Sequence, residues 1–479
     1  MNAKDLSLRF GLVHLLARRF GFMLCAQWGS SLLVIVFTVL LARTGPEILG
    51  LFTLALAMSI LVTMITGAGF ENYLIPRFSE RRVDKRNLLA QTWLLQACLF
   101  LVSLALLALV CIILGYDNEK SLLIFLIAAG MGPIAMSKSF FALCRVQGRH
   151  DTEMRIRVPA GLAGSLFGIV ALLLEAPLPV IFCFKLLEAL VLFMLIGVAL
   201  RWRLDLIAVK FGAWTNKWRD GFLFTGISVC GLLYNKLNLY LLDQYSGSYD
   251  LGLYSAPWEM IDTISALISG ALIERVLFPL MAEQWRKDSA AFMRCNRISL
   301  QCMLLLGLFT SYLLFMEGDR LLTLIYGAQY HQAAALLYAQ IPCILAAFLH
   351  NLAACMLLST QRYRIVFLIY VSGLVWNIIL CVTLIPVHSA LGASFAITGT
   401  KLWMACLTVG FSIYCGLGFQ LRPILIAAAA AVLAWGLYDG SLHYMPRREA
   451  AEAIGLVPLL ALAGWWIRSA VAQQAKQTK

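Results

Sequence analysis

Ten ionisable side chains interrupt the long apolar runs of this 479-residue sequence. A charge at the centre of a lipid bilayer costs roughly 2.5 to 3.5 kcal/mol on insertion scales, so each such residue must face a cavity, an opposite charge or the membrane interface. Five are cations and five are carboxylates, which leaves both ion pairing and the binding of a charged ligand open. They are Lys138, Lys185, Lys236, Arg275 and Lys401, with Glu71, Glu188, Glu259, Asp262 and Glu274.

Two of these cations have the chemistry of a phosphate site. Lys236 lies between Asn235 and Asn238, whose amides add polar surface that lipid would not tolerate, and Lys401 lies near the middle of a later run. A lysine ammonium binds phosphate as a point charge. The alternatives are a Lys236 side chain that extends to the headgroups, and pairing of Lys401 with a carboxylate.

Glu259 and Asp262 are three residues apart, and therefore on one face of a helix, near the middle of an apolar run. Neighbouring carboxylates in a partly desolvated site hold protons more readily than isolated ones. The pair is therefore the candidate site for a coupling ion or proton. Ion pairing with Lys236 or Lys401 and hydrogen bonding to a sugar are the alternatives.

Other charged residues lie toward the inner ends of apolar runs. Lys138 is either a cation that faces a portal or one that extends to the headgroups. Glu71 and Arg77 flank the inner end of one run, where they either form a gate ion pair or are solvated at the surface. Lys185 and Glu188 are three residues apart and are expected to neutralise each other.

The composition requires a membrane as the environment of these residues. Hydrophobic residues make up 61% of the chain and charged residues only 13%, with a mean hydropathy of +0.83. A soluble domain is nearer half apolar and a quarter charged. Soluble enzymes, nucleic-acid binders and disordered scaffolds are therefore excluded. The 13 cysteines never occur in C-x-x-C spacing and the six histidines form no ligand pattern, so no metal, cofactor or disulfide framework is indicated.

Apolar runs of the length of a membrane-spanning helix, about 20 residues, occur fourteen times, and the last two are the shortest. Before the first run, basic and apolar side chains alternate at helical spacing, which is typical of an amphipathic helix in the membrane interface. The predicted spans are 21–43, 48–70, 88–115, 121–143, 158–176, 179–200, 221–242, 250–272, 298–316, 333–358, 365–386, 389–414, 424–438 and 453–468.

Lysines and arginines are distributed unevenly between the two sides of these spans. If the N-terminus is cytoplasmic, the inside segments carry 28 of them and the outside segments only five. Cytoplasmic loops are enriched in Lys and Arg, so both termini are predicted to be cytoplasmic. The net charge of +13 then mainly reflects topology, with attraction to anionic lipid headgroups as a secondary effect.

An internal repeat at an offset of about 202 residues predicts the architecture. Residues 48–55 (ILGLFTLA) resemble residues 250–256 (DLGLYSA), and each segment continues to a proline followed by a basic loop. An all-α membrane fold with two parallel six-helix lobes is expected. Its domains are an amphipathic helix at 1–20, an N-lobe at 21–200, a linker at 201–220, a C-lobe at 221–414, and two extra helices with a cytoplasmic tail at 415–479.

Several short motifs recur in a characteristic order over some 350 residues of the chain. They are Gly45-Pro46-Glu47 before Gly50-Leu51-Phe52-Thr53, then Gly252-Leu253-Tyr254-Ser255, Phe278-Pro279, Leu324-Ile325-Tyr326-Gly327, and Leu384-Ile385-Pro386 before Gly392-Ala393-Ser394-Phe395-Ala396. In these motifs the sequence resembles the polysaccharide-exporter branch of the multidrug/oligosaccharidyl-lipid/polysaccharide (MOP) superfamily, the flippases of O-antigen and exopolysaccharide repeat units.

The resemblance implies a MATE-like fold and a transporter, not an enzyme, that moves a polyprenyl-diphosphate-linked oligosaccharide across the bacterial inner membrane by alternating access. It also implies that Arg18, just before the first span, meets the diphosphate at the cytoplasmic mouth, with ordinary positive-inside anchoring as the alternative. Membrane lipids, a polysaccharide polymerase and chain-length machinery are the implied partners. Family members often have an acidic residue at two positions where this sequence has none. The first position lies in the stretch Gly67-Ala68-Gly69 and the second is Asn238, so the resemblance does not assign a coupling role to either.

Two other functions compete with the flippase. A drug or cation antiporter of the same superfamily would be favoured by an excess of acidic charge in the cavity, whereas this sequence has five cations in its spans. A membrane-embedded polymerase or glycan ligase would need a substantial external loop with catalytic residues. The longest external stretch here, near residues 438–452, has about 15 residues.

Reporter fusions test the predicted orientation. Because the two lobes are parallel repeats, we expect the same alternation of inside and outside signals in both halves. An inverted pattern in the second half would refute the parallel repeat. The fusion points are after Tyr116, Tyr245 and His388 for the outside, and after Asp84, Asp151 and Asp288 for the inside.

Overall fold

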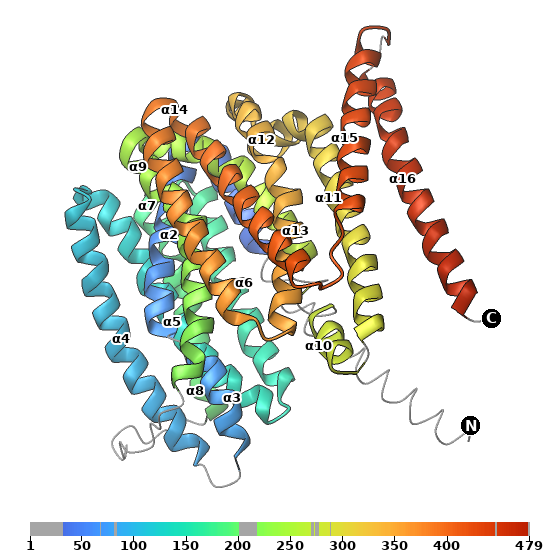
Figure 1. The fold of residues 1–479 in the computed structure, drawn as a ribbon. Coiled ribbons are helices and arrows are strands. Elements are labelled where there is room, and N and C mark those ends of the chain that lie inside the picture. Colours follow the sequence, from blue (N-terminus) through green and yellow to red (C-terminus); the bar gives the residue numbers. More distant parts are fainter. Residues whose placement is uncertain are drawn as a thin grey trace. The chain divides into compact units, whose positions relative to one another are not determined.

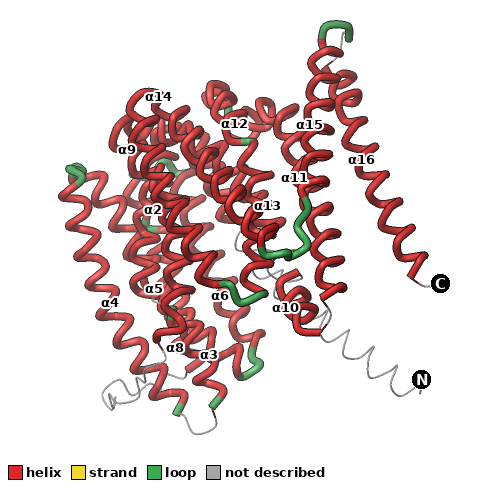
Figure 2. Tube along the Cα trace, in the orientation of Figure 1, coloured by secondary structure: helices red, strands yellow, loops and turns green. Residues whose placement is uncertain are grey.

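The computed structural model describes residues 32–67, 69–80, 84–200, 218–269, 273, 277–287, 289–445 and 448–477. Within these ranges every regular element is a helix, as Figure 2 shows, so the prediction of an all-α membrane fold is confirmed. The expected amphipathic helix at 1–20, which includes Arg18, lies outside the described residues. The same holds for residues 201–217 of the expected linker.

The chain forms two compact units, with the boundary between Thr225 and Gly226. In the first unit the described residues begin with an apolar helix at Leu32–Thr44. Asp84 and Asp117 precede two of the longer helices, and their carboxylates accept hydrogen bonds from backbone N–H groups of the first turn, as N-caps do. The labelled helices (Figure 1) are α2 (Pro46–Gly67), α3 (Phe70–Ser79), α4 (Lys85–Ile113), α5 (Asn118–Val146), α6 (His150–Leu173), α7 (Leu178–Phe182) and α8 (Phe184–Leu200).

The second unit contains most of α9 and all later helices. Its described elements are α9 (Trp218–Ser269), α10 (Phe278–Lys287), α11 (Ser289–Tyr326), the 3-10 helix η2 (Ala328–Ala333), α12 (Ala334–Gln340), α13 (Pro342–Ser359), α14 (Tyr363–Tyr414), α15 (Leu421–Leu442) and α16 (Arg448–Gln477). α13 packs against α14 and α11 and is the most completely buried of the membrane-spanning helices described here.

Two of these helices are too long for a single crossing. α9 and α14 each have 52 residues, or about 78 Å at 1.5 Å per residue, more than twice the hydrocarbon core of roughly 30 Å. The backbone leaves the helical conformation at Gly247 (φ 83°) in α9 and at Ser389 (φ 49°) in α14. Positive φ is open to glycine, whereas at serine it is strained. Each helix therefore has two arms that meet at these residues.

Fourteen spans are predicted from the sequence. Among the described residues, ten helices are long and apolar enough to cross a membrane; α14 is one of them and α9 is not. α15 and α16, predicted as the shortest spans, have 22 and 30 residues. The stretch at 243–250, predicted as an external loop, is helical on both sides of Gly247.

Aromatic rings and glycines decide how the first unit packs. Phe37 and Phe184 are fully buried and their ring centroids are 4.7 Å apart. Gly130 of α5 and Gly164 of α6 lie directly against α8: a Cβ at Gly164 would be 2.7 Å from the Glu188 Cβ, and one at Gly130 would overlap the Lys185 backbone. Small residues allow this close approach of helices inside a membrane.

Arg448 attaches the α15–α16 pair to α11. Its guanidinium donates to the two carboxylate oxygens of Asp319, each at 3.0 Å, to the Met316 carbonyl, and to Glu452 at 3.0 Å. The Tyr312 hydroxyl of α11 donates to the Glu452 carbonyl at 2.6 Å. A two-pronged arginine–carboxylate contact is stronger and more directional than a simple ion pair, so this end of α16 is fixed to α11.

The glycine contacts give a stability test. Gly130→Ala should lower the unfolding free energy by about 1 to 3 kcal/mol, because the methyl group has no space against α8. Gly436→Ala is the matched control: it is also inside a helix, but a Cβ there meets nothing within 4 Å, and alanine is the better helix former. Thermal unfolding of the purified protein measures both, and equal stability of the two variants would contradict the packing.

Candidate functional site

Lys401, on the second arm of α14, is a buried cation held by aromatic side chains. It is 8% exposed. Its Nζ donates to the Tyr234 hydroxyl at 3.3 Å, and it lies 5.0 Å from the centroid of that ring and 5.8 Å from the Trp258 ring. Among the described residues, no carboxylate is within the 4.0 Å of an ion pair with Lys401. Cation–π contacts in a desolvated site are worth about 2 kcal/mol each, so aromatic faces stabilise this charge in place of a contact ion pair.

The structure brings four of the predicted residues together in the second unit. Glu259 and Asp262 are on one face of the second arm of α9, where Glu259 is half-buried and Asp262 is exposed. Asp262 interacts electrostatically with Lys401, and Glu259 interacts with Lys236 and Asp262. None of the four forms an ion pair within 4.0 Å in the described part of the chain. We call these four residues the C-lobe charge cluster.

The two asparagines beside Lys236 have different environments. Asn238 is fully buried, and its Nδ2 donates to the Tyr254 hydroxyl. Tyr254 in turn stacks on Trp258 at 6.3 Å with an interplanar angle of 15°. Asn238 therefore supports the aromatic wall, and its predicted contact with a substrate stays a prediction. Asn235 is half-buried, and its Oδ1 atom, like that of Asn238, is buried without a hydrogen-bond partner.

Sequence reasoning did not assign the aromatic side chains to the site. Tyr234 and Trp258 are not among the predicted site residues. Their positions two residues before Lys236 and one residue before Glu259 were the available signal. The Tyr234 ring also contacts the Tyr370 ring at 6.1 Å, and the Tyr370 hydroxyl lies 3.1 Å from His350 Nε2. His350 on α13 thus forms a hydrogen bond with α14.

A small cavity adjoins this network. Its volume is about 310 Å³, and Asn351, Cys355 and Tyr370 are among the residues that line it. Phe278, at the start of α10, closes part of the wall. The aromatic network thus has open space on one side within the second unit.

In the first unit, the expected Glu71–Arg77 pair is not formed. Glu71 contacts Arg145 of α5, which also binds Glu153 of α6 at 2.8 and 3.0 Å. Arg77 pairs instead with Glu80, at 3.2 Å. Six residues along a helix place Glu71 and Arg77 about 120° apart, whereas Arg145 approaches Glu71 from a neighbouring helix. Arg145 therefore links three helices.

The remaining predicted cations differ in their partners. Lys138 is exposed on α5 and has no carboxylate within ion-pair distance among the described residues. Lys185 and Glu188 form an ion pair at 2.6 Å, as their spacing predicts. Both side chains of this pair are largely buried, so the pair is close to neutral as a unit. Arg18 lies outside the described residues.

Comparisons with solved structures agree with this arrangement of helices. The lipid II flippase MurJ in an inward closed conformation matches with a TM-score of 0.68 and 14% identity, over 94% of this chain and 100% of that chain. An inward-facing multidrug resistance MATE family transporter of the MOP superfamily matches at 0.62 and 15%, over 84% and 95%. A MOP superfamily transporter from Pyrococcus furiosus matches at 0.55 and 12%, over 82% and 93%. At these identities the similarity concerns the fold.

The family itself is indicated by sequence. No curated protein matches the chain. A family model described as "Polysaccharide biosynthesis protein" matches residues 40–335, which is more than half of the chain. With this match, and with the fold of MOP superfamily transporters, the chain belongs to the polysaccharide biosynthesis protein family.

Proposed function

We propose that this protein is a flippase that carries a polyprenyl-diphosphate-linked oligosaccharide across the bacterial inner membrane by alternating access, for O-antigen or exopolysaccharide biosynthesis. The observation that supports it most is Lys401, a buried cation with no contact carboxylate, in a membrane protein of a polysaccharide biosynthesis family. The predicted topology, with both termini in the cytoplasm, is part of this proposal.

The charges suit a diphosphate. A diphosphate brings about two negative charges, and its transfer into a low-dielectric site is offset only by cations held close to it. Lys236 and Lys401 supply two cations, and no carboxylate of the described residues engages either of them at contact distance. Lys185 is already neutralised by Glu188. The C-lobe charge cluster is therefore the better diphosphate site.

The other predicted residues take supporting roles in this proposal. Asn235 would accept a hydrogen bond from a sugar hydroxyl, since its Oδ1 has no partner in the protein. Lys138 and Arg18 would meet the diphosphate near the cytoplasmic side, while the polyprenyl tail remains in lipid. Glu71, through Arg145, and Arg77, through Glu80, would hold the inner ends of their helices in one state of the cycle.

Glu259 and Asp262 would couple the transport to an ion. Asp262 interacts with Lys401, so an anionic substrate at Lys401 competes with the ionised Asp262 carboxylate. Substrate binding and protonation of this carboxylate therefore favour each other, which is the form of a reciprocal coupling between two sites.

A drug or cation antiporter is the second candidate. The observation that favours an antiporter is that, among the described residues, no cation lies within 4.0 Å of the Glu259 or Asp262 carboxylate. In that case the carboxylates would bind the substrate and the lysines would repel it, so the two candidates predict opposite effects of removing the lysine charges.

Removal of the cluster cations tests the proposal. Lys236→Met or Lys401→Met keeps the length of the side chain but removes its charge, and a lost hydrogen bond to a charged group costs about 1.5 to 3 kcal/mol. Export of the glycan should fall roughly tenfold or more, with lipid-linked glycan accumulating on the inner leaflet. Charge-preserving Lys236→Arg should restore part of the export. Glycan export is measured in cells with matched protein levels.

The matched control is the double variant Lys185→Met/Glu188→Gln. It removes a buried lysine of the first unit together with its partner, so no unpaired charge remains, and export should change little. Normal export by both cluster variants would exclude a diphosphate at this site. A gain in cation export by the same variants would favour the antiporter.

Removal of the carboxylates tests coupling separately. Glu259→Gln/Asp262→Asn keeps side-chain volume but removes the groups that exchange protons, so export should be abolished although the protein still inserts. Thermal unfolding of the purified variant confirms that it is folded. Wild-type flux in the double variant would show that coupling does not depend on the second arm of α9.

A further inference from the structure

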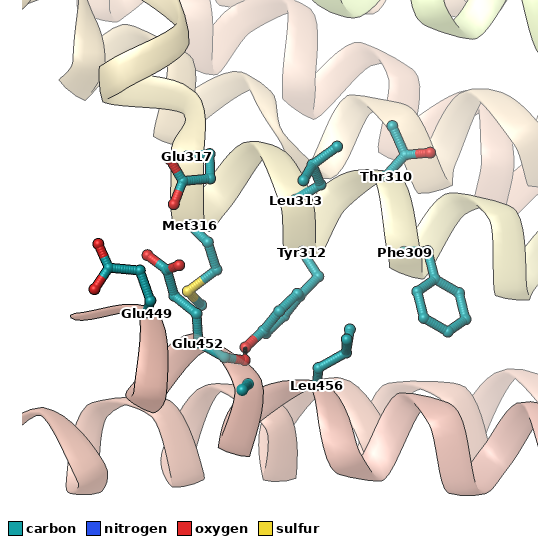
Figure 3. A pocket seen from close by; sticks show the side chains of 10 residues that line it. Phe309, Thr310, Tyr312, Leu313, Met316, Glu317, Glu449, Glu452 and Leu456 are labelled. Atoms are coloured by element: carbon teal, nitrogen blue, oxygen red, sulfur yellow. Dashed lines mark hydrogen bonds between the residues drawn. The ribbon is translucent and has the colours of Figure 1, made fainter. Parts of the chain in front are cut away.

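A second cavity of about 550 Å³ lies in the second unit between α11 and α16 (Figure 3). Its size falls within the range of roughly 300 to 1,000 Å³ that is usual for small-ligand sites. Phe309 and Leu313 of α11 and Leu456 of α16 form an apolar wall. The cavity has no residue in common with the C-lobe charge cluster, and its ligand is independent of the proposed flippase activity.

Acidic side chains gather at one end of this cavity. Glu317 of α11 and Glu449 and Glu452 of α16 all line it, and Figure 3 shows their carboxylates close together. Glu452 and Glu317 line the same end of the cavity and interact electrostatically. Carboxylates so close together repel one another unless a cation or a proton lies between them. The end of the cavity therefore has the electrostatics of a cation site.

The neighbouring arginines do not balance this charge. Arg448 is engaged by Asp319 and Glu452. Arg320 pairs with Glu317 at 3.2 Å and with Glu449 at 3.8 Å. Among the described side chains, two guanidinium groups thus serve four carboxylates, and Glu317 and Glu449 share one arginine. Among the described side chains this leaves an excess of negative charge at the mouth of an otherwise apolar groove.

The apolar surface continues away from the acidic end. On α11, Leu306 is 38% exposed and Leu313 is 56% exposed, and seven residues separate them, so they share one face. On α16, Leu460 is 54% exposed and lies one helical turn beyond Leu456. Because both helices span the membrane, this face is open to lipid. An amphiphile with a cationic head and apolar tails matches both the charge and the surface.

We propose that this groove binds a phospholipid with a primary-amine headgroup, of the phosphatidylethanolamine class. The ammonium group donates hydrogen bonds to Glu317 and Glu449, the phosphate lies toward Arg320, and an acyl chain follows Leu306 and Leu460. A primary ammonium offers three N–H donors to carboxylates, whereas a choline headgroup has none. An anionic glycerol headgroup is repelled by the excess negative charge.

Native mass spectrometry of the purified full chain tests this assignment. Phosphatidylethanolamine, phosphatidylcholine and phosphatidylglycerol with identical acyl chains are added in separate titrations. We expect the amine lipid to bind most tightly. In the variant Glu317→Gln/Glu449→Gln its affinity should fall roughly tenfold, because both carboxylate contacts with the ammonium group are lost.

The control Glu47→Gln/Glu119→Gln removes two exposed carboxylates of the first unit that, like Glu449, lie in the first turn of a helix. This control should bind the amine lipid as the wild type does.

Leu313→Trp fills the apolar part of the groove and should weaken the binding of all three lipids, while thermal unfolding verifies that each variant is folded. Preference for the anionic or choline lipid, or unchanged amine-lipid binding in the Glu317→Gln/Glu449→Gln variant, would overturn the proposal. Occupation of the groove by a second copy of the chain would overturn it as well.

Discussion

The cost of a charge in a low-dielectric membrane is the constraint to which the rest of this structure responds. The chain meets it in three ways. Lys185 is neutralised in contact with Glu188 at 2.6 Å. Lys401 is enclosed by aromatic rings. Arg145 and Arg448 lie at helix ends, where each binds carboxylates from neighbouring helices. Of these four residues, Lys401 alone has no contact anion within the described part of the chain, and that difference separates a structural charge from one that can bind a ligand.

The aromatic wall makes the second arrangement sustainable. Tyr234 and Trp258 stabilise Lys401 through the electrostatics of their ring faces, which does not consume the ammonium group as a carboxylate would. Asn238 and Tyr254 hold the Trp258 ring in place from behind. An arriving anion therefore finds a cation that is already desolvated and oriented, and binding requires no ion pair to be broken. Such preorganisation is what a site for a charged substrate needs.

The same constraint shapes the outer parts of the second unit. Arg448 fixes the start of α16 to α11 through Asp319 and Glu452, and this attachment brings the carboxylates of the two helices together. The groove with its acidic end is a consequence of that attachment: the arginine that joins the helices cannot also neutralise Glu317 and Glu449. A contact that stabilises the hairpin thereby creates a charged, lipid-facing surface.

Hydropathy and periodicity determined the all-helical membrane fold, because a membrane-spanning helix satisfies its own backbone hydrogen bonds and depends little on its neighbours. The Lys185–Glu188 pair was predictable for the same reason, since it is local to one helix. Contacts between helices were not. Glu71 binds Arg145, 74 residues away, where sequence proximity suggested Arg77. Lys401 meets Tyr234 across 167 residues. Only the tertiary structure decided these partners, because a single sequence shows which face a residue occupies but not which helix lies opposite it.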